Sequence, residues 1–116
     1  MPVYDVTDYN QIQQVLQSSG TAVIDCHAKY FHSLFRWCGP CVAIAPYATQ
    51  KSDQTGIPML KIDVDVAPQL SGAYQVSSMP TFLVVKGSWN NVIYRVSGGS
   101  QQYVDYVFST AQQHKW

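Results

Sequence analysis

Apolar residues recur along this chain in two patterns, one with helical spacing and one nearly continuous, and each predicts a different element. The first stretch with helical spacing carries Ile12, Val15 and Leu16. Thr7 or Asp8 can cap the start of this helix with a side-chain oxygen, and Gly20 is typical of a helix C-terminus. The next segment, residues 21–28, is mainly apolar and bounded by that glycine. A run of this kind predicts a strand buried on both faces.

The rest of the chain continues to alternate between strands and helices. A helix is expected after the cysteines near position 40, through about Lys51, with Pro46 kinking it because a proline ring displaces a helical carbonyl. Ser100 can cap a last helix. One face of that helix would carry Tyr103, Val104, Val107 and Phe108. The other expected elements are strands at 3–6, 57–64, 81–86 and 92–96, and a short helix at 67–74 that starts with Pro68.

This order, β-α-β-α-β-α-β-β-α, predicts an α/β fold. Strands linked through helices are expected to pair in parallel, whereas the last two strands, joined by a short hairpin, must be antiparallel. The result would be one mixed sheet with helices on both faces. The chain has 116 residues and no linker or repeat, so a single domain spanning 1–116 is expected.

Composition narrows the possible functions. The chain is 47% hydrophobic and 12% charged, which is enough apolar material for a core. Its formal net charge is zero and it has no cluster of Lys and Arg, which argues against a nucleic-acid partner. No apolar run approaches the length of a membrane span, and the first residues do not resemble a secretory signal. Three cysteines make a poor disulfide scaffold and favour a cytoplasmic location.

The candidate chemistry lies in the segment Trp37-Cys38-Gly39-Pro40-Cys41. This CxxC motif follows a predicted strand and opens a predicted helix, which is the setting of a redox-active pair. The start of a helix presents unpaired N–H groups and the positive end of the dipole, so a thiolate placed there is stabilised and its pKa falls. The second cysteine lies one turn further on and can close a disulfide with the first.

A zinc site is the alternative interpretation of the same cysteines. Cys26, His27 and His32 lie nearby in the sequence and could complete a ligand set. There is no second CxxC, however, and the histidines are scattered, so redox chemistry is favoured. Cys26 is expected to be a small hydrophobic core residue.

The segment directly before the motif is unexpectedly apolar. Phe31, Leu34 and Phe35 have helical spacing and would extend the helix backwards, which would place Cys38 in its interior. Pro40 argues against this, because proline is tolerated in the first turn but costs about 3 kcal/mol in a helix interior. The helix is therefore expected to start near Cys38, and the apolar segment to form a loop or a separate short turn.

Taken together, these segments resemble thioredoxin over nearly the whole chain. The resemblance rests on VIDCHA, WCGPC, VAIAP, KIDVD, the segment from AYQV to MPT, FLVVKG and VSGG. WCGPC combined with the distant MPT is far more specific than a lone CxxC. The resemblance implies a thioredoxin fold that reduces protein disulfides. It also implies that no cofactor is bound and that NADPH supplies the electrons through thioredoxin reductase.

The resemblance assigns roles to several residues. Cys38 would be the nucleophile and Cys41 the resolving thiol. Asp25 would be a buried proton acceptor for Cys41, and Lys61 would tune it. The substrate surface would comprise Trp37, Gly39, Pro40, Met79, Pro80 and Gly98. Pro80 would follow a cis peptide bond, and the Met79 backbone would pair with an extended substrate.

The chain departs from the thioredoxin pattern in one main place. Residues 29–36 stand where one residue is usual, a seven-residue insertion at about 30–36. It could fold onto the nearby surface, or form a contact patch for a partner or a weak homodimer, since exposed apolar clusters often mark interfaces. The second functional hypothesis is a thioredoxin-like binding module with low turnover, because the insertion obstructs substrate or reductase docking.

Overall fold

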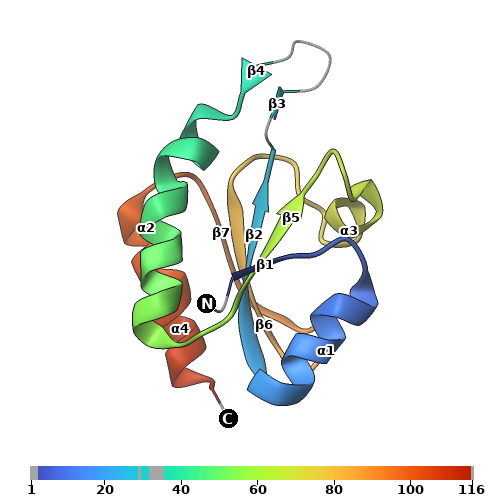
Figure 1. Cartoon of the computed structure of the whole chain (residues 1–116), viewed down its shortest axis with the longest axis vertical. Coiled ribbons are helices and arrows are strands. Elements are labelled where there is room, and N and C mark those ends of the chain that lie inside the picture. The colour runs from blue at the N-terminus through green and yellow to red at the C-terminus, as the bar shows by residue number, and fades with distance from the viewer. Residues whose placement is uncertain (1–2, 29, 32–35, 116) are drawn as a thin grey trace.

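A five-stranded mixed sheet forms the centre of the computed structural model, which describes residues 3–28, 30–31 and 36–115 (Figure 1). The strand order is β1-β5-β2-β6-β7. The strands are β1 (Val3–Asp5), β2 (Thr21–His27), β5 (Met59–Asp63), β6 (Thr81–Lys86) and β7 (Val92–Ser97). Both β1 and β2 pair with β5 in parallel, and β6 pairs antiparallel with β2 and β7. The predicted mixed sheet and its terminal hairpin are confirmed.

The direction of β6 corrects the expectation that strands linked through a helix run parallel. β5 and β6 are linked through α3 (Pro68–Ala73), yet β6 runs opposite to β5, because β2 is parallel to one and antiparallel to the other. A helix of six residues is about 9 Å long, shorter than the roughly 16 Å of a five-residue strand, so it does not return the chain along the sheet. The ends of β2 and β5 and the start of β6 therefore meet at one end of the sheet.

Helices cover both faces of the sheet, as predicted. Figure 1 shows α2 (Gly39–Thr55) and α4 (Gln101–Gln113) on one side, and α1 (Tyr9–Ser19) and α3 on the other. Successive β2 side chains point to opposite faces. Ile24 lies in the core beneath α1 and α3, whereas Val23 lies in the core beneath α2 and α4. The fold thus has two apolar cores, one on each face.

Local signals set the helix ends. Asp8 caps α1 and accepts a hydrogen bond from the Gln11 amide at 2.9 Å. Gly20 closes that helix with a φ of 76°. At the other face, α2 continues through Thr55 to Gly56, past the expected end at Lys51, because the first residue suited to a left-handed cap is this glycine.

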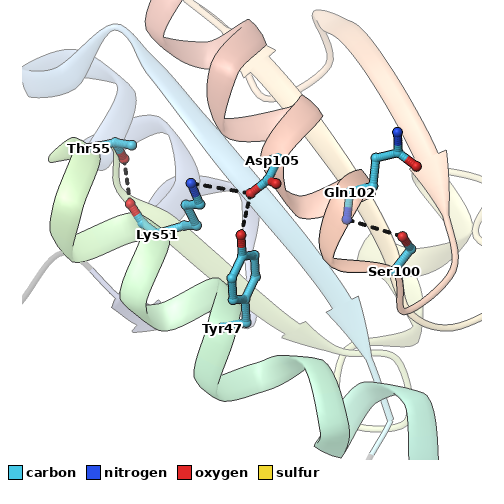
Figure 2. Close-up of polar contacts among 6 residues, drawn as sticks. All are labelled: Tyr47, Lys51, Thr55, Ser100, Gln102 and Asp105. Carbon is cyan, nitrogen blue, oxygen red and sulfur yellow. Dashed lines mark hydrogen bonds and ion pairs between the residues drawn. The ribbon is translucent and has the colours of Figure 1, made fainter.

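A polar cluster joins α2 to α4 (Figure 2). The Tyr47 hydroxyl donates to Asp105 Oδ1 at 2.6 Å, and Lys51 Nζ lies 3.3 Å from the same oxygen. Ser100 caps α4 by accepting from the Gln102 amide at 3.1 Å. Exposed pairs of this kind contribute at most about 1 kcal/mol. Together with the apolar core, the contacts of Tyr47 and Lys51 with Asp105 link α4 to α2, which carries the cysteine motif at its start.

The apolar segment before the motif begins and ends as paired strands. β3 (Tyr30–Phe31) and β4 (Arg36–Trp37) form an antiparallel pair outside the main sheet. This replaces the expected loop or short turn. Aromatic residues favour extended backbone, which is consistent with the pairing. The prediction of a loop or turn at residues 32–35 lies outside the described residues, and so do the side chains of the predicted apolar contact patch. Figure 1 places β3 and β4 beyond the end of β2 and ahead of α2.

Membrane insertion has no candidate segment in the described part of the chain. None of its helices combines the length and apolarity needed to span a bilayer.

Candidate active site

The two cysteines of the motif lie at the start of α2, as predicted. Cys38 is the N-cap, and Pro40 lies in the first turn. Cys38 and Cys41 form a disulfide with their Cα atoms 5.2 Å apart. The Cys41 amide donates to Cys38 Sγ at 3.3 Å. The first sulfur therefore receives a hydrogen bond and lies at the positive end of the helix dipole, which favours its thiolate once the disulfide is reduced.

Both sulfur-bearing side chains are buried. Cys38 has none of its surface exposed, and Cys41 has 6% exposed. They form a small apolar cluster with Ala28, against which Val64 and Met79 pack. Sequence patterns did not reveal the burial of Cys38, because it depends on how distant segments pack around the helix start.

Two loops from distant parts of the chain close around the disulfide. The Met79–Pro80 peptide bond is cis, as expected. The Gly98 amide donates to the Pro80 carbonyl at 2.8 Å, which joins the loop before α4 to the start of β6. A Cβ atom at Gly99 would lie 3.1 Å from both Cβ and the carbonyl oxygen of Pro40. Because Gly99 has no side chain, this loop can approach the active-site helix. Gly99 was not among the predicted site residues, although the adjacent pair Gly98-Gly99 could have pointed to a close approach of the backbone.

Asp25 lies behind the disulfide, on the face of β2 that α2 covers. It is 2% exposed, and its Oδ1 makes no hydrogen bond within the described part of the chain. Burial raises the pKa of Asp25 to about 6, while the positive charge of Lys61 acts in the opposite direction. Lys61 is the residue on β5 that pairs with Asp25 in register. The sequence-predicted pair is therefore brought together, and its carboxyl can exchange a proton near neutral pH.

A cavity of about 340 Å³ connects this carboxyl with the second cysteine. Its lining includes Asp25, Cys41 and Lys61, together with His27. The remaining lining residues, mostly apolar and mainly from α2, are Ala28, Val42, Ala45, Pro46 and Thr49. A cavity of this size can hold several water molecules, which could carry a proton between the carboxyl and the thiol.

The predicted substrate surface is only partly described. Gly39 and Pro40 are exposed at the start of α2, next to the disulfide. The backbone of Trp37 lies in β4, and its side chain is outside the described structure. The role of Trp37 therefore stays a prediction.

Cys26 is separated from the disulfide by the sheet. It belongs to the core beneath α1 and α3, and burial raises the pKa of its thiol to about 12. This agrees with its prediction as a core residue. Within the described ranges, no three His, Cys, Asp or Glu residues gather in a group that could hold a metal ion. His32 lies outside those ranges.

A disulfide at a helix start, with a titratable carboxyl behind it, is built for reversible thiol–disulfide exchange. The fold and the site together define a thiol–disulfide oxidoreductase. The family model described as Thioredoxin matches residues 2–107, and the chain belongs to the thioredoxin family. This family needs no bound cofactor, since the cysteine pair itself carries the electrons.

Curated relatives and solved structures agree with this assignment. Thioredoxin-2 of Pyricularia oryzae is 37% identical over 87 residues, which cover 74% of this chain and 47% of that protein. Thioredoxin of Chlorobaculum thiosulfatiphilum is 31% identical over 86 residues, covering 72% and 73%. The chain thus spans about half of the first relative and nearly three quarters of the second. The crystal structure of Malassezia sympodialis thioredoxin is 29% identical with a TM-score of 0.79, covering 100% of this chain and 96% of that one.

Proposed function

We propose that this chain reduces disulfide bonds in other proteins by means of the Cys38–Cys41 pair. The observation that carries the proposal is the position of Cys38 at the N-terminus of α2, where its sulfur accepts the Cys41 amide. Backbone donors there favour the anionic sulfur that attacks disulfides. Membership of the thioredoxin family supports the same reaction.

The first step forms a mixed disulfide. In the reduced protein the Cys38 thiolate attacks one sulfur of the substrate disulfide. A bond forms between Cys38 Sγ and that sulfur, and the other substrate sulfur leaves as a thiolate, which then takes a proton from water.

The second step releases the substrate. The Cys41 thiol gives its proton to the Asp25 carboxylate, and the resulting thiolate attacks Cys38 Sγ. The mixed disulfide breaks, the second substrate sulfur leaves as a thiolate, and the Cys38–Cys41 disulfide forms. Two electrons have then passed from the protein to the substrate. Lys61 would tune the second step, because its charge opposes the effect of burial on the Asp25 carboxyl.

The loops around the disulfide would bind an extended stretch of substrate. The Met79 backbone would pair with the substrate chain, as strand addition at an open backbone edge does in other peptide complexes. Met79 packs against the buried sulfurs, which supports this placement. The other residues proposed to border the substrate are Trp37, Gly39, Pro40, Pro80 and Gly98.

The cell would recharge the pair through a partner. We propose that NADPH-dependent thioredoxin reductase returns two electrons to the disulfide. The proposed setting is the cytoplasm, where the pair would take part in electron transport and redox balance; a single CxxC with one further buried cysteine supports this. We also propose that the chain forms a weak homodimer through residues 30–36, which a concentration series of solution masses can test.

Reduction of insulin by dithiothreitol tests the proposed function. Catalytic amounts of this chain are expected to accelerate precipitation of the insulin B chain well beyond the rate with dithiothreitol alone. The variant Cys26→Ser is the matched control, because it removes a thiol that lies outside the site. It should retain the activity. Precipitation no faster than with dithiothreitol alone would contradict the proposal.

A binding module with low turnover is the second candidate, and the burial of Cys38 favours it. Removing residues 30–36 joins Ala28 to Trp37 through a single residue, Lys29, as in the family pattern. If the insertion limits access, the deletion should raise the rate of Cys38 alkylation in the reduced protein by about threefold or more, since thiol reactivity follows exposure. Alkylation by iodoacetamide from pH 5 to 9, followed by mass spectrometry, measures it. Equal rates and equal insulin turnover in the two forms would reject obstruction.

A further inference from the structure

Tyr103 lies in the first turn of α4, on the face that the sequence predicts to be apolar. Val104, Val107 and Phe108 on that face are buried in the core beneath α2 and α4. Tyr103 differs from them, because it is only partly buried. A Cβ atom at Gly98 would lie 3.0 Å from Cε2 and 3.3 Å from Cδ2 of its ring. The ring therefore packs against the Gly98 backbone, shortly before the helix begins.

Gly98 belongs to the segment that closes one side of the active site. Its amide donates to the Pro80 carbonyl at 2.8 Å. Its φ is 125°, a backbone conformation that residues other than glycine rarely adopt. At the next residue, Gly99, an added Cβ atom would meet Pro40 at 3.1 Å. The Gly98–Gly99 segment therefore contacts the cis-proline loop, the start of α2 and the ring of Tyr103.

A pair of hydroxyl groups fixes the residue before this segment. Thr81 Oγ1 donates to the Ser78 carbonyl at 2.6 Å, and Ser97 Oγ lies 2.9 Å from Thr81 Oγ1. A hydroxyl has one hydrogen to donate, so the Ser97 hydroxyl is the donor in the second contact. The two hydroxyls and the Gly98 amide thus tie the end of β7 to the cis-proline loop. From α4, the ring of Tyr103 supports the same segment.

We propose that Tyr103 is a positioning residue for substrate binding, and that it acts through Gly98. The inference rests on the proposed function and deepens it. The ring fills the space beside Gly98 into which the Gly98–Gly99 segment would otherwise withdraw. It thereby keeps this segment at a fixed distance from the Met79 backbone. A substrate that contacts both meets a preformed surface, so its binding does not have to order the segment.

The variant Tyr103→Ala tests this role through a comparison of two substrates. The KM for insulin, a protein substrate, should rise by about threefold to tenfold, because the surface is no longer preformed. Hydroxyethyl disulfide has no peptide chain, so the rate at which the reduced protein reduces it should change by less than about twofold. Tyr103→Phe keeps the ring and should keep the KM of the unaltered chain. Tyr106→Ala is the matched control, because Tyr106 is an exposed tyrosine about one turn further along α4.

The outcomes separate a positioning role from a structural one. An unchanged KM for insulin in Tyr103→Ala would overturn the proposal. Equal slowing with insulin and with hydroxyethyl disulfide would also overturn it, since that pattern indicates general damage to the site. The same holds if Tyr103→Phe is as impaired as Tyr103→Ala, because the effect would then belong to the hydroxyl. Each of these results leaves the proposed function intact if the unaltered chain reduces insulin. An inactive unaltered chain would refute the function itself and, with it, the role in substrate binding.

Nuclear magnetic resonance tests the contact independently of activity. In the unaltered oxidised chain, the Tyr103 ring protons should show nuclear Overhauser effects to the Gly98 α protons, because the ring packs on that backbone. In Tyr103→Ala, the Gly98 amide should exchange its hydrogen at least about tenfold faster, since the segment opens locally more often. The Val84 amide, in the central strand β6, should keep its rate and so report an intact fold. Missing ring contacts in the unaltered chain, or an unchanged Gly98 rate in the variant, would refute the role of Tyr103.

Discussion

Replacing Cys38 by serine is expected to abolish disulfide reduction, and replacing Cys41 by serine to arrest it halfway. Without Cys38 no sulfur accepts the helix-start hydrogen bond, so no mixed disulfide forms. Without Cys41 the first step still occurs, but nothing resolves its product. Insulin turnover should fall by at least about a thousandfold in both variants, since the chemistry depends on a pair acting as a unit.

The two variants differ in what they accumulate, and this difference assigns the roles. Cys41→Ser should hold a covalent adduct with a disulfide substrate, visible as an added mass that dithiothreitol removes. Cys38→Ser should form no such adduct. The reverse pattern would exchange the proposed nucleophile and resolving thiol. Equal adducts in both variants would show that either sulfur can attack.

Replacing Asp25 by asparagine is expected to stabilise the fold at neutral pH while slowing substrate release. The pKa of Asp25 rises from 3.8 to about 6 on folding because of burial, so the folded state binds the proton more tightly than the unfolded state. Stability from this group is fully present below about pH 4 and is lost as pH rises through 6. At pH 7 the loss is about 3 kcal/mol, from a shift of roughly two units at about 1.4 kcal/mol each.

Asparagine removes this dependence because it carries no charge at any pH. Denaturant unfolding of the oxidised protein should show Asp25→Asn to be more stable by up to about 3 kcal/mol at pH 7, and the gain should disappear near pH 4. Asp53→Asn is the matched control; Asp53 is exposed on α2, and its variant should change stability by less than about 0.5 kcal/mol. Release from the mixed disulfide should slow by about tenfold to a hundredfold at pH 7. A gain that persists at pH 4 would contradict the role of burial.

The sequence predicted those features that depend on local chemistry. Asp8, Gly20 and Pro40 mark helix ends through their own side chains or backbone freedom, and the structure confirms each. The pairing of the cysteines followed from their one-turn spacing, and the cis bond at Pro80 followed from the family resemblance. These features require knowledge of only a few neighbouring residues or of a recognised motif.

Features that depend on the path of the chain were harder to predict. The reversed β6 follows from a connection too short to recross the sheet, and alternation of strands and helices does not show this. The burial of Cys38 and the approach of Gly99 to Pro40 arise from segments distant in sequence. The cavity behind the disulfide likewise draws its lining from β2, β5 and α2.

The close approach of Gly99 to Pro40 has a consequence for protein engineering. The segment that carries the cysteines lies against a turn from much later in the chain, so closely that a methyl group added at Gly99 would meet Pro40 at 3.1 Å. Transplanting the cysteine segment alone into another scaffold would leave one wall of the site behind. A designer who wishes to move this chemistry must therefore move both segments in their mutual geometry.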